Sequence, residues 1–389
     1  IFAGAVHDFL AGMISLRNGG ESLPETIGRY LGVNFKQFMR GFTVLLMVLV
    51  GAVFVAGPAG LLAKLSPESL DLSFWATVVF VYYVLATLLP IDKIIGKIYP
   101  IFAIALIFMA AGILFMIFWH HPALPELTDG IANTHPDGLP IFPMMFISIA
   151  CGAISGFHAT QSPLMARCMT NEKYGRPVFY GAMITEGIVA LIWAAAATYF
   201  FHTEEGSALF AAGSGNDNAA VIVDSITKEW LGVVGGFLAI LGVIAAPITS
   251  GDTAFRSARL IVADFLRVDQ KPILKRLMIS VPLFVAGYII LHANFSVLWR
   301  YFAWCNQTLA VFTLWALTVY LTQKRKPYVI TLIPALFMTA VCSTYILIAR
   351  EGLHLPQELA YWLGGAVTLF IFVLFLVWRN KYLRRNPTI

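Results

Sequence analysis

Residues 141–163 read IFPMMFISIACGAISGFHATQSP, and this stretch decides how the chain is interpreted. It is long enough to cross a bilayer, and its first half is uniformly apolar. Its second half carries glycine, serine, histidine, threonine, glutamine and proline. Lipid offers backbone groups no hydrogen-bond partner, so a spanning helix unwinds at depth only where protein or a wet cavity receives the freed amides and carbonyls. An interrupted helix that carries an ionisable side chain is typical of a binding site inside a transporter.

The composition places the whole chain in a membrane. Of its 389 residues, 59% are apolar and only 12% are charged, whereas a soluble domain has about 25% charged residues. The sequence contains no Gly-rich phosphate loop, no HExxH, no GxSxG and no basic stripe suited to nucleic acid. We therefore expect a protein of the lipid bilayer with no enzymatic activity, no cofactor and no nucleic-acid partner.

Long apolar blocks fill the sequence and predict helices that cross about 30 Å of hydrocarbon. They are too long and too uniformly apolar for the strands of a membrane barrel, which alternate over about ten residues. We predict an all-α polytopic helix bundle that forms one transmembrane domain over residues 1–389. After a partial block at 1–17, the expected spans are 42–65, 72–90, 100–120, 141–165, 178–202, 232–251, 277–292, 302–322, 328–349 and 359–378.

The basic residues set the expected orientation. Successive gaps between spans lie on opposite sides of the membrane, so the gaps fall into two alternating sets. One set holds all but four of the 26 lysines and arginines. The four in the other set are Lys64, Lys228, Arg300 and Arg350. By the positive-inside rule the basic-rich set is cytoplasmic, so the block at 141–165 runs from outside to inside. The C-terminal RNKYLRRN is then cytoplasmic, and we interpret it as a stop-transfer anchor in preference to a lipid-specific site.

The polar half of 141–165 is the candidate substrate site. Ser162 followed by Pro163 is typical of the N-cap and first position of a restarted helix. The positive dipole end of that helix would face the cavity and favour a carboxylate. The alternative is a proline kink with small residues for close packing, but a kink alone needs no cluster of polar side chains. Asn306 and Gln307, amides inside a later span, are costly there unless bonded across helices. The predicted substrate-binding residues are Ser155, Gly156, His158, Thr160, Gln161, Asn306 and Gln307.

Three ionisable side chains inside spans are candidates for carrying a coupling proton. Glu186 is the first choice, because burial keeps a carboxyl neutral unless it is paired. Ala182 and Ala190 share its helical face, so it is expected to look into the bundle. The alternative role is a structural hydrogen bond to a neighbouring helix. Asp8 is the second choice, with His7 beside it. These two residues could form a proton relay, and the alternative is that they pack at a helix interface or form an ion pair.

A hydroxyl cluster near the end of the block at 232–251 is a candidate sodium site. Thr249, Ser250 and Thr253 offer oxygens that suit a hard cation. These hydroxyls equally suit a helix end, and we expect Asp252 to hold Arg256 in a structural role.

Five segments carry a family resemblance. They are IFAGAVHDFLAGMISLR at 1–17, GESLPETIGRYLG at 20–32, CGAISGFHATQSP at 151–163, PITSGDTAFRSARLIVADFL at 247–266 and WRYFAWCNQTLA at 299–310. Together they resemble the carbon starvation protein A family of bacterial inner-membrane transporters, and the similarity runs from residue 1 to about residue 345. The resemblance implies transport of peptides or, as in some members, proton-coupled transport of pyruvate.

The resemblance also implies a LeuT-type fold of the amino acid–polyamine–organocation superfamily. That fold has two inverted five-helix repeats, with the first and sixth helices broken at the substrate site. The block at 141–165 then becomes the sixth core helix and 232–251 the eighth. Residues 1–322 form the core, and 323–389 add two further helices and a cytoplasmic tail. We expect the N-terminal block to be the tail of a longer helix, preceded by the first broken helix, without which this chain should not transport.

These expectations describe a secondary active transporter linked to carbon starvation. It would import pyruvate or short peptides across the bacterial inner membrane with a proton, or as second choice with sodium. The alternative is a membrane sensor that binds a carbon source and signals to a cytoplasmic or kinase partner without flux. The choice between pyruvate and peptide, the coupling ion and the oligomeric state stay open at this point.

Overall fold

The computed structural model describes residues 2–88, 92–121, 124, 133, 138–149, 152–204, 206, 208, 219–293 and 295–386. Every regular element within these ranges is a helix, which confirms the all-α prediction. The helices belong to two compact units, each assembled from separate stretches of the chain. The units are described one at a time below.

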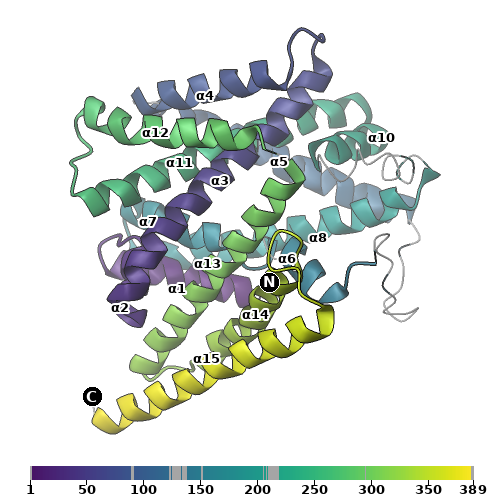
Figure 1. Ribbon diagram of the computed structural model, residues 1–389. Coiled ribbons are helices and arrows are strands. Elements are labelled where there is room, and N and C mark those ends of the chain that lie inside the picture. The colour runs from purple at the N-terminus through teal and green to yellow at the C-terminus, as the bar shows by residue number, and fades with distance from the viewer. Residues whose placement is uncertain are drawn as a thin grey trace. The chain divides into compact units, whose positions relative to one another are not determined.

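The first unit comprises Ile1–Thr43, Ala132–Thr185 and Arg300–Ile389. Within it α1 packs along α7, and α14 packs along α15 (Figure 1). Its elements are α1 (Phe2–Arg17), α2 (Leu23–Leu31), the first turns of α3 (Val33–Leu65), η2 (Ile141–Met145), α6 (Phe146–Ile149), α7 (Gly156–Cys168), η4 (Glu172–Tyr174), η5 (Arg176–Gly181), most of α13 (Phe295–Gln323), α14 (Val329–Ile348) and α15 (Gln357–Arg385).

Glycines on α1 allow this helix to approach its neighbours closely. A Cβ atom on Gly4 would lie 1.7 Å from the carbonyl oxygen of Ala153, and one on Gly12 would lie 2.5 Å from the ring of Phe179. Small residues at helix contacts let backbones come together where lipid gives no hydrophobic driving force. This close approach packs α1 against η5 and against the residues just before α7.

The interior of the first unit forms between α13 and α14. Leu314 of α13 packs with Ala335 and Val341 of α14, and all three are fully buried. The indole Nε1 of Trp315 donates to Thr339 Oγ1 at 3.0 Å, which satisfies a polar group that would be costly to bury alone. α14 therefore belongs to the packed interior of this unit.

The second unit comprises Val44–Ile131 and Glu186–Trp299. Within it α4, α11 and α12 lie side by side (Figure 1). Its elements are the rest of α3, α4 (Leu72–Leu88), α5 (Asp92–His120), α8 (Ala182–Phe201) from Glu186 onward, α10 (Ala219–Ala239), η6 (Ile240–Ile244), α11 (Ala245–Leu266), α12 (Ile273–Leu291) and the start of α13.

An aromatic cluster centred on Phe255 holds the second unit together. Its ring centroid lies 5.0 Å from that of Phe284 and 5.7 Å from that of Tyr83. Cβ atoms on Gly51 and Gly287 would lie 2.3 Å and 2.6 Å from the Phe255 ring. The two glycines therefore make the room that this large side chain fills between α3 and α12.

Within the described residues, seven helices are long and apolar enough to cross a membrane. The expected span 141–165 is not among them because it is broken. The expected span 232–251 is divided between α10, η6 and α11, so none of these helices contains it. The seven segments are Val33–Leu65, Pro100–His120, Glu172–Phe201, Ile273–Leu291, Val297–Gln323, Val329–Ile348 and Gln357–Arg385, and Leu72–Thr87 is a shorter apolar helix.

An ion-pair cluster ties α2 to the first turns of α3. The carboxylate of Glu25 pairs with Lys36 and with Arg40, and the three side chains are between 18% and 26% exposed. Burial raises the pKa of the Glu25 carboxyl, but the two cations outweigh this effect and leave that pKa below its ordinary value.

Replacing Glu25 by glutamine is expected to lower the free energy of unfolding at neutral pH by about 1 kcal/mol. Because the folded-state pKa is depressed, the ionised carboxylate stabilises the fold fully above its unfolded value near 4.5, and this contribution disappears as pH falls through the folded value. Thermal unfolding midpoints of the wild type and the variant should differ at pH 7 and converge in acid, once the pH has fallen below the depressed folded-state pKa of Glu25. Glu68→Gln, at an exposed position, is the matched control. It should leave the unfolding midpoint unchanged both at pH 7 and in acid. A gap that persists in acid would contradict the ion-pair origin.

Candidate functional site

The stretch singled out by the sequence is interrupted in the structure. The helical turns of η2 and α6 end at Ile149, and α7 begins at Gly156. The described residues between them end with Ser155 in an extended conformation (φ −126°, ψ 123°). The interruption predicted for the span at 141–165 is therefore confirmed, and it lies before Gly156.

The predicted point of helix restart is wrong. α7 begins at Gly156 rather than at Ser162, so Ser162 and Pro163 lie inside the helix. The Ser162 hydroxyl donates to the carbonyl oxygen of His158 at 3.0 Å, a bond that serine makes back to its own helix. The Ser-Pro pair carries the local signal of a helix start, but a contact from a distant segment sets the start earlier.

Asn306 of α13 supplies that contact. Its Oδ1 accepts a hydrogen bond from the backbone N–H of Phe157 at 2.7 Å, and its Nδ2 donates to Ser155 Oγ at 3.1 Å. Asn306 and Ser155 are fully buried. A Cβ atom on Gly156 would lie 2.4 Å from the Asn306 carbonyl oxygen and 2.6 Å from Leu309 Cβ. Asn306 thus acts as the N-cap that the local sequence does not provide, and its predicted contact with substrate stays a prediction.

Asp8 of α1 lies between two histidines. Its Oδ1 is 2.7 Å from His7 Nδ1, and its Oδ2 is 2.9 Å from His158 Nδ1 of α7. The carboxylate is the acceptor, so both imidazoles donate through Nδ1. The side chains of His7 and Asp8 are 0% and 8% exposed, whereas that of His158 is 21% exposed. The cluster therefore has a buried end at His7 and a more accessible end at His158.

The second ring nitrogen of His7 is unusual. His7 Nε2 is buried and has no hydrogen-bond partner among the described residues. An unpaired buried nitrogen costs free energy, so the cluster contains a buried polar atom that the described residues leave unsatisfied.

The remaining predicted substrate residues lie at the start of α7 or on α13. Thr160 Oγ1 donates to the Phe157 carbonyl oxygen at 2.6 Å, and Gln161 Nε2 donates to Thr160 Oγ1 at 3.0 Å. Gln307 is fully buried on α13 beside Asn306. The first turns of α7 therefore carry His158, Thr160 and Gln161 together, as the sequence predicted, although in a helix instead of a coil.

Glu186 is the first residue of the second unit in its stretch of the chain, directly after Thr185 of the first unit. It lies in α8, is partly buried, and falls in the second unit, whereas Asp8 and His158 fall in the first. Its role as a proton carrier stays a prediction.

The hydroxyls of the candidate sodium site bond to their own helix. Thr249 Oγ1 donates to the Ala246 carbonyl oxygen at 2.8 Å, and Thr253 Oγ1 donates to the Thr249 carbonyl oxygen at 2.9 Å. These bonds use the hydroxyl protons and leave the oxygen lone pairs for a cation, so the site, with Ser250 as its third member, stays a prediction. Asp252 Oδ2 accepts from Arg256 Nη2 at 3.1 Å, which confirms the expected pairing.

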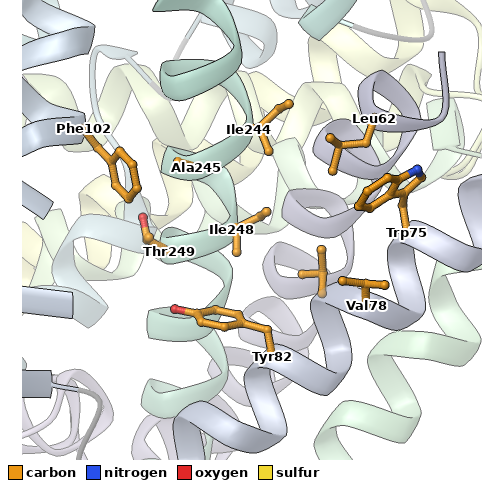
Figure 2. Close-up of a pocket in the computed structure, with 10 residues that line it drawn as sticks. Leu62, Trp75, Val78, Tyr82, Phe102, Ile244, Ala245, Ile248 and Thr249 are labelled. Carbon is orange, nitrogen blue, oxygen red and sulfur yellow. The ribbon is translucent and has the colours of Figure 1, made fainter. Parts of the chain in front are cut away.

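An apolar cavity of about 410 Å³ lies in the second unit. Phe102 and Thr249 border one side of it, and Leu62 and Trp75 border the other (Figure 2). None of the described residues that line it is charged or carries an amide. Such walls mainly suit apolar groups, so the start of α7 stays the candidate substrate site.

The link between Asp8 and His158 is the feature that sequence reasoning missed. Both residues were singled out separately, one as a proton carrier and the other as a substrate contact. They are 150 residues apart, and no local pattern pairs them. The only available signal was that each is a rare ionisable group inside an apolar block. No group of three or more His, Cys, Asp or Glu side chains within the described part of the chain is arranged to hold a metal ion.

Comparisons with known proteins agree with this architecture. The family model for carbon starvation protein CstA matches residues 1–70, 63–231 and 200–345. The chain also resembles a solved structure, a mutant of the manganese transporter of Eremococcus coleocola, with a TM-score of 0.56 at 14% identity. That match covers 98% of this chain and 87% of the transporter. At such low identity the likeness concerns the fold alone.

Curated relatives share parts of the sequence. An uncharacterized membrane protein of Haemophilus influenzae is 38% identical over 255 residues, which cover 53% of this chain and 69% of that protein. The peptide transporter CstA of Campylobacter jejuni is 28% identical over 254 residues, covering 49% of this chain and 36% of the transporter. The pyruvate/proton symporter BtsT of Escherichia coli is 41% identical over 78 residues, covering 20% of this chain and 11% of the symporter. The matches thus span well under half the length of the two named transporters. The chain is a multi-pass membrane protein that belongs to the carbon starvation protein CstA family.

Proposed function

We propose that this chain forms the substrate and proton site of a secondary active transporter of the bacterial inner membrane. The cargo is a small carboxylate nutrient, either pyruvate or a short peptide, and the coupling ion is a proton. The observation that carries the proposal is the broken helix, whose restarted part, α7, holds His158 against Asp8 of α1. The relatives named as a peptide transporter and as a pyruvate/proton symporter support both substrate classes.

The start of α7 supplies the recognition of a carboxylate. The dipole of α7 is positive at its first turn and favours an anion nearby through its field, although the Phe157 N–H is already bonded to Asn306. His158 lies in that turn and is the more exposed end of the cluster, so its imidazolium form can pair with the carboxylate of a substrate. Thr160 and Gln161 in the same turns offer hydrogen bonds that orient the rest of the molecule. The carboxylate is the group that pyruvate and a peptide C-terminus share.

Asp8 and its two histidines supply the proton site. The Asp8 carboxylate lies between two imidazoles, and an added proton neutralises its negative charge. The proton leaves through His158, the more accessible of the two histidines. This cluster and the broken helix belong to one compact unit. Because Asp8 is joined to both histidines, we place the coupling proton on this cluster ahead of Glu186, and we keep sodium at Thr249, Ser250 and Thr253 as the second choice.

The broken helix also supports a LeuT-type arrangement. In that arrangement α7 with the turns before it is the sixth core helix and α1 the second, and inverted repeats place the substrate near the bilayer midplane. The likeness to a manganese transporter over 98% of the chain supports a transporter fold of this general kind. The distribution of basic residues supports a cytoplasmic C-terminus.

Uptake into proteoliposomes tests the proposal. The protein is expressed from its complete reading frame, reconstituted, and supplied with labelled pyruvate or a labelled dipeptide, with and without an acidic exterior. We expect one of the two labels to accumulate only when the pH gradient is present. Protein-free liposomes are the control. Ligand binding without any flux would overturn the proposal in favour of a membrane sensor.

A further inference from the structure

A groove with aromatic walls lies in the first unit, away from the candidate substrate site. It has a volume of about 370 Å³ and is bordered by α2, the first turn of α3, α13 and α15. Aliphatic side chains complete the walls. The aromatic residues that line it are Tyr30, Phe35, Phe312, Trp315, Phe375 and Trp378.

The groove runs along α15 and ends beside a group of cations. Its wall on this helix includes Ile371, Leu374 and Trp378, which spans about 10 Å at 1.5 Å per residue. Arg379 follows Trp378 directly, and its guanidinium lies 5.2 Å from the ring centroid of Tyr328. The groove is therefore apolar along its length, and a cation, Arg379, follows at the end that Trp378 forms.

Two basic segments meet beyond this end of the groove. Lys324, Arg325 and Lys326 follow the end of α13, and Arg325 Nη2 donates to the Asn386 carbonyl oxygen after α15 at 2.6 Å. This bond brings the segment of α13 next to the basic end of α15. The cations of that end are Arg379, Lys381, Arg384 and Arg385.

These seven cations differ from other cations of the same unit. Arg17 pairs with Glu172, Arg29 with Glu21, and Lys36 and Arg40 with Glu25. None of the seven forms an ion pair with a carboxylate in the part of the chain that the structure describes. Their positive charge is therefore available to an anion from outside the protein.

We propose that this groove binds an anionic phospholipid. One acyl chain lies along Leu374 and Trp378, and the phosphate headgroup meets the cations after α13 and α15. An acyl chain matches apolar walls, and Lys and Arg clusters at the cytoplasmic end of a span attract anionic headgroups. The basic tail then has a specific lipid partner beyond its predicted role as a stop-transfer anchor. This inference stands independently of the proposed transport function.

Quenching of tryptophan fluorescence by brominated lipids tests the proposal. The protein is reconstituted in phosphatidylcholine with a small fraction of brominated phosphatidylglycerol or, in parallel, brominated phosphatidylcholine. The groove contribution is the part of the quenching that disappears in a variant with Trp315→Phe and Trp378→Phe. We expect this part to be stronger with the anionic lipid, and equal quenching by the two lipids would overturn the proposal.

Two further variants separate the headgroup from the chain. Replacing Lys324, Arg325 and Lys326 by glutamine should weaken the preference for the anionic lipid by about a hundredfold, at about 1 kcal/mol for each cation. The matched control replaces three exposed cations of the second unit, Arg267, Lys271 and Lys275, and should leave the preference unchanged. Leu374→Phe, at an exposed position in the groove wall, narrows the groove without adding a tryptophan and should weaken the groove contribution for both lipids. An equal loss in the control triple variant would overturn the proposal, because it would show a general surface-charge effect.

Discussion

Replacing Asp8 by asparagine is expected to abolish uphill uptake while leaving exchange of substrate intact. Asparagine keeps the size of the side chain and an acceptor for one histidine, but it cannot ionise. A pH difference of one unit stores about 1.4 kcal/mol per proton and supports about tenfold accumulation at one proton per substrate. The accumulation ratio of the variant should fall to about one. Retained counterflow of labelled against unlabelled substrate shows that the variant is folded and binds its cargo.

Two comparisons sharpen this result. Glu68→Gln removes an exposed carboxylate and should leave accumulation at the wild-type level. Glu186→Gln tests the rival carrier, because the sequence favoured Glu186 while the structure joins Asp8 to His7 and His158. Loss of accumulation in Glu186→Gln together with full accumulation in Asp8→Asn would assign the proton to Glu186 and refute our placement.

The sequence predicted the helical class because the chain is apolar over long blocks, but it did not predict which helices are interior. In lipid, both a neighbouring helix and an acyl chain are apolar, so the buried and exposed faces carry the same residue types. Leu309 and Leu314 of α13 are fully buried, whereas Leu369 and Phe370 of α15 are 62% and 63% exposed. Nothing in the local composition of the two helices separates these pairs. Hydrophobic patterning, which marks the core of a soluble protein, gives little information here.

The candidate site was predictable in its location and not in its geometry. The small and polar residues of 152–163 marked a break, because a membrane helix carries such a run only for a reason. The restart point depended on Asn306, whose amide caps α7 from 149 positions along the chain. The pairing of Asp8 with His158 depended equally on the packing of α1 against α7. Contacts of this range follow from the fold, which the local sequence does not encode.

Placing a single methyl group at position 156 is expected to destabilise the site strongly. In Gly156→Ala the new Cβ atom would lie 2.4 Å from the carbonyl oxygen of Asn306, 2.6 Å from Leu309 Cβ and 2.9 Å from the backbone nitrogen of Ala310. Two of these atoms belong to the α13 backbone and cannot turn aside as a side-chain tip can. Overpacking of this kind costs about 1–3 kcal/mol, and moving α7 away from α13 also weakens the hydrogen bond between Phe157 N–H and Asn306. We expect a lower thermal unfolding midpoint and weaker substrate binding.

Gly365→Ala is the matched control for this change. Gly365 is also helical and belongs to the same unit, but a Cβ atom there would meet nothing within 4 Å. Alanine removes the entropic disadvantage of glycine in a helix. The free energy of unfolding of this variant should therefore stay the same or rise by up to about 1 kcal/mol, and its unfolding midpoint should not fall. The opposite signs at two helical glycines would show that close contact with α13, and not helix propensity, makes glycine necessary at position 156. If both variants unfolded at the same temperature and bound substrate equally well, α7 would not be docked on α13 as described, and the assignment of its first turn to the substrate would lose its structural support.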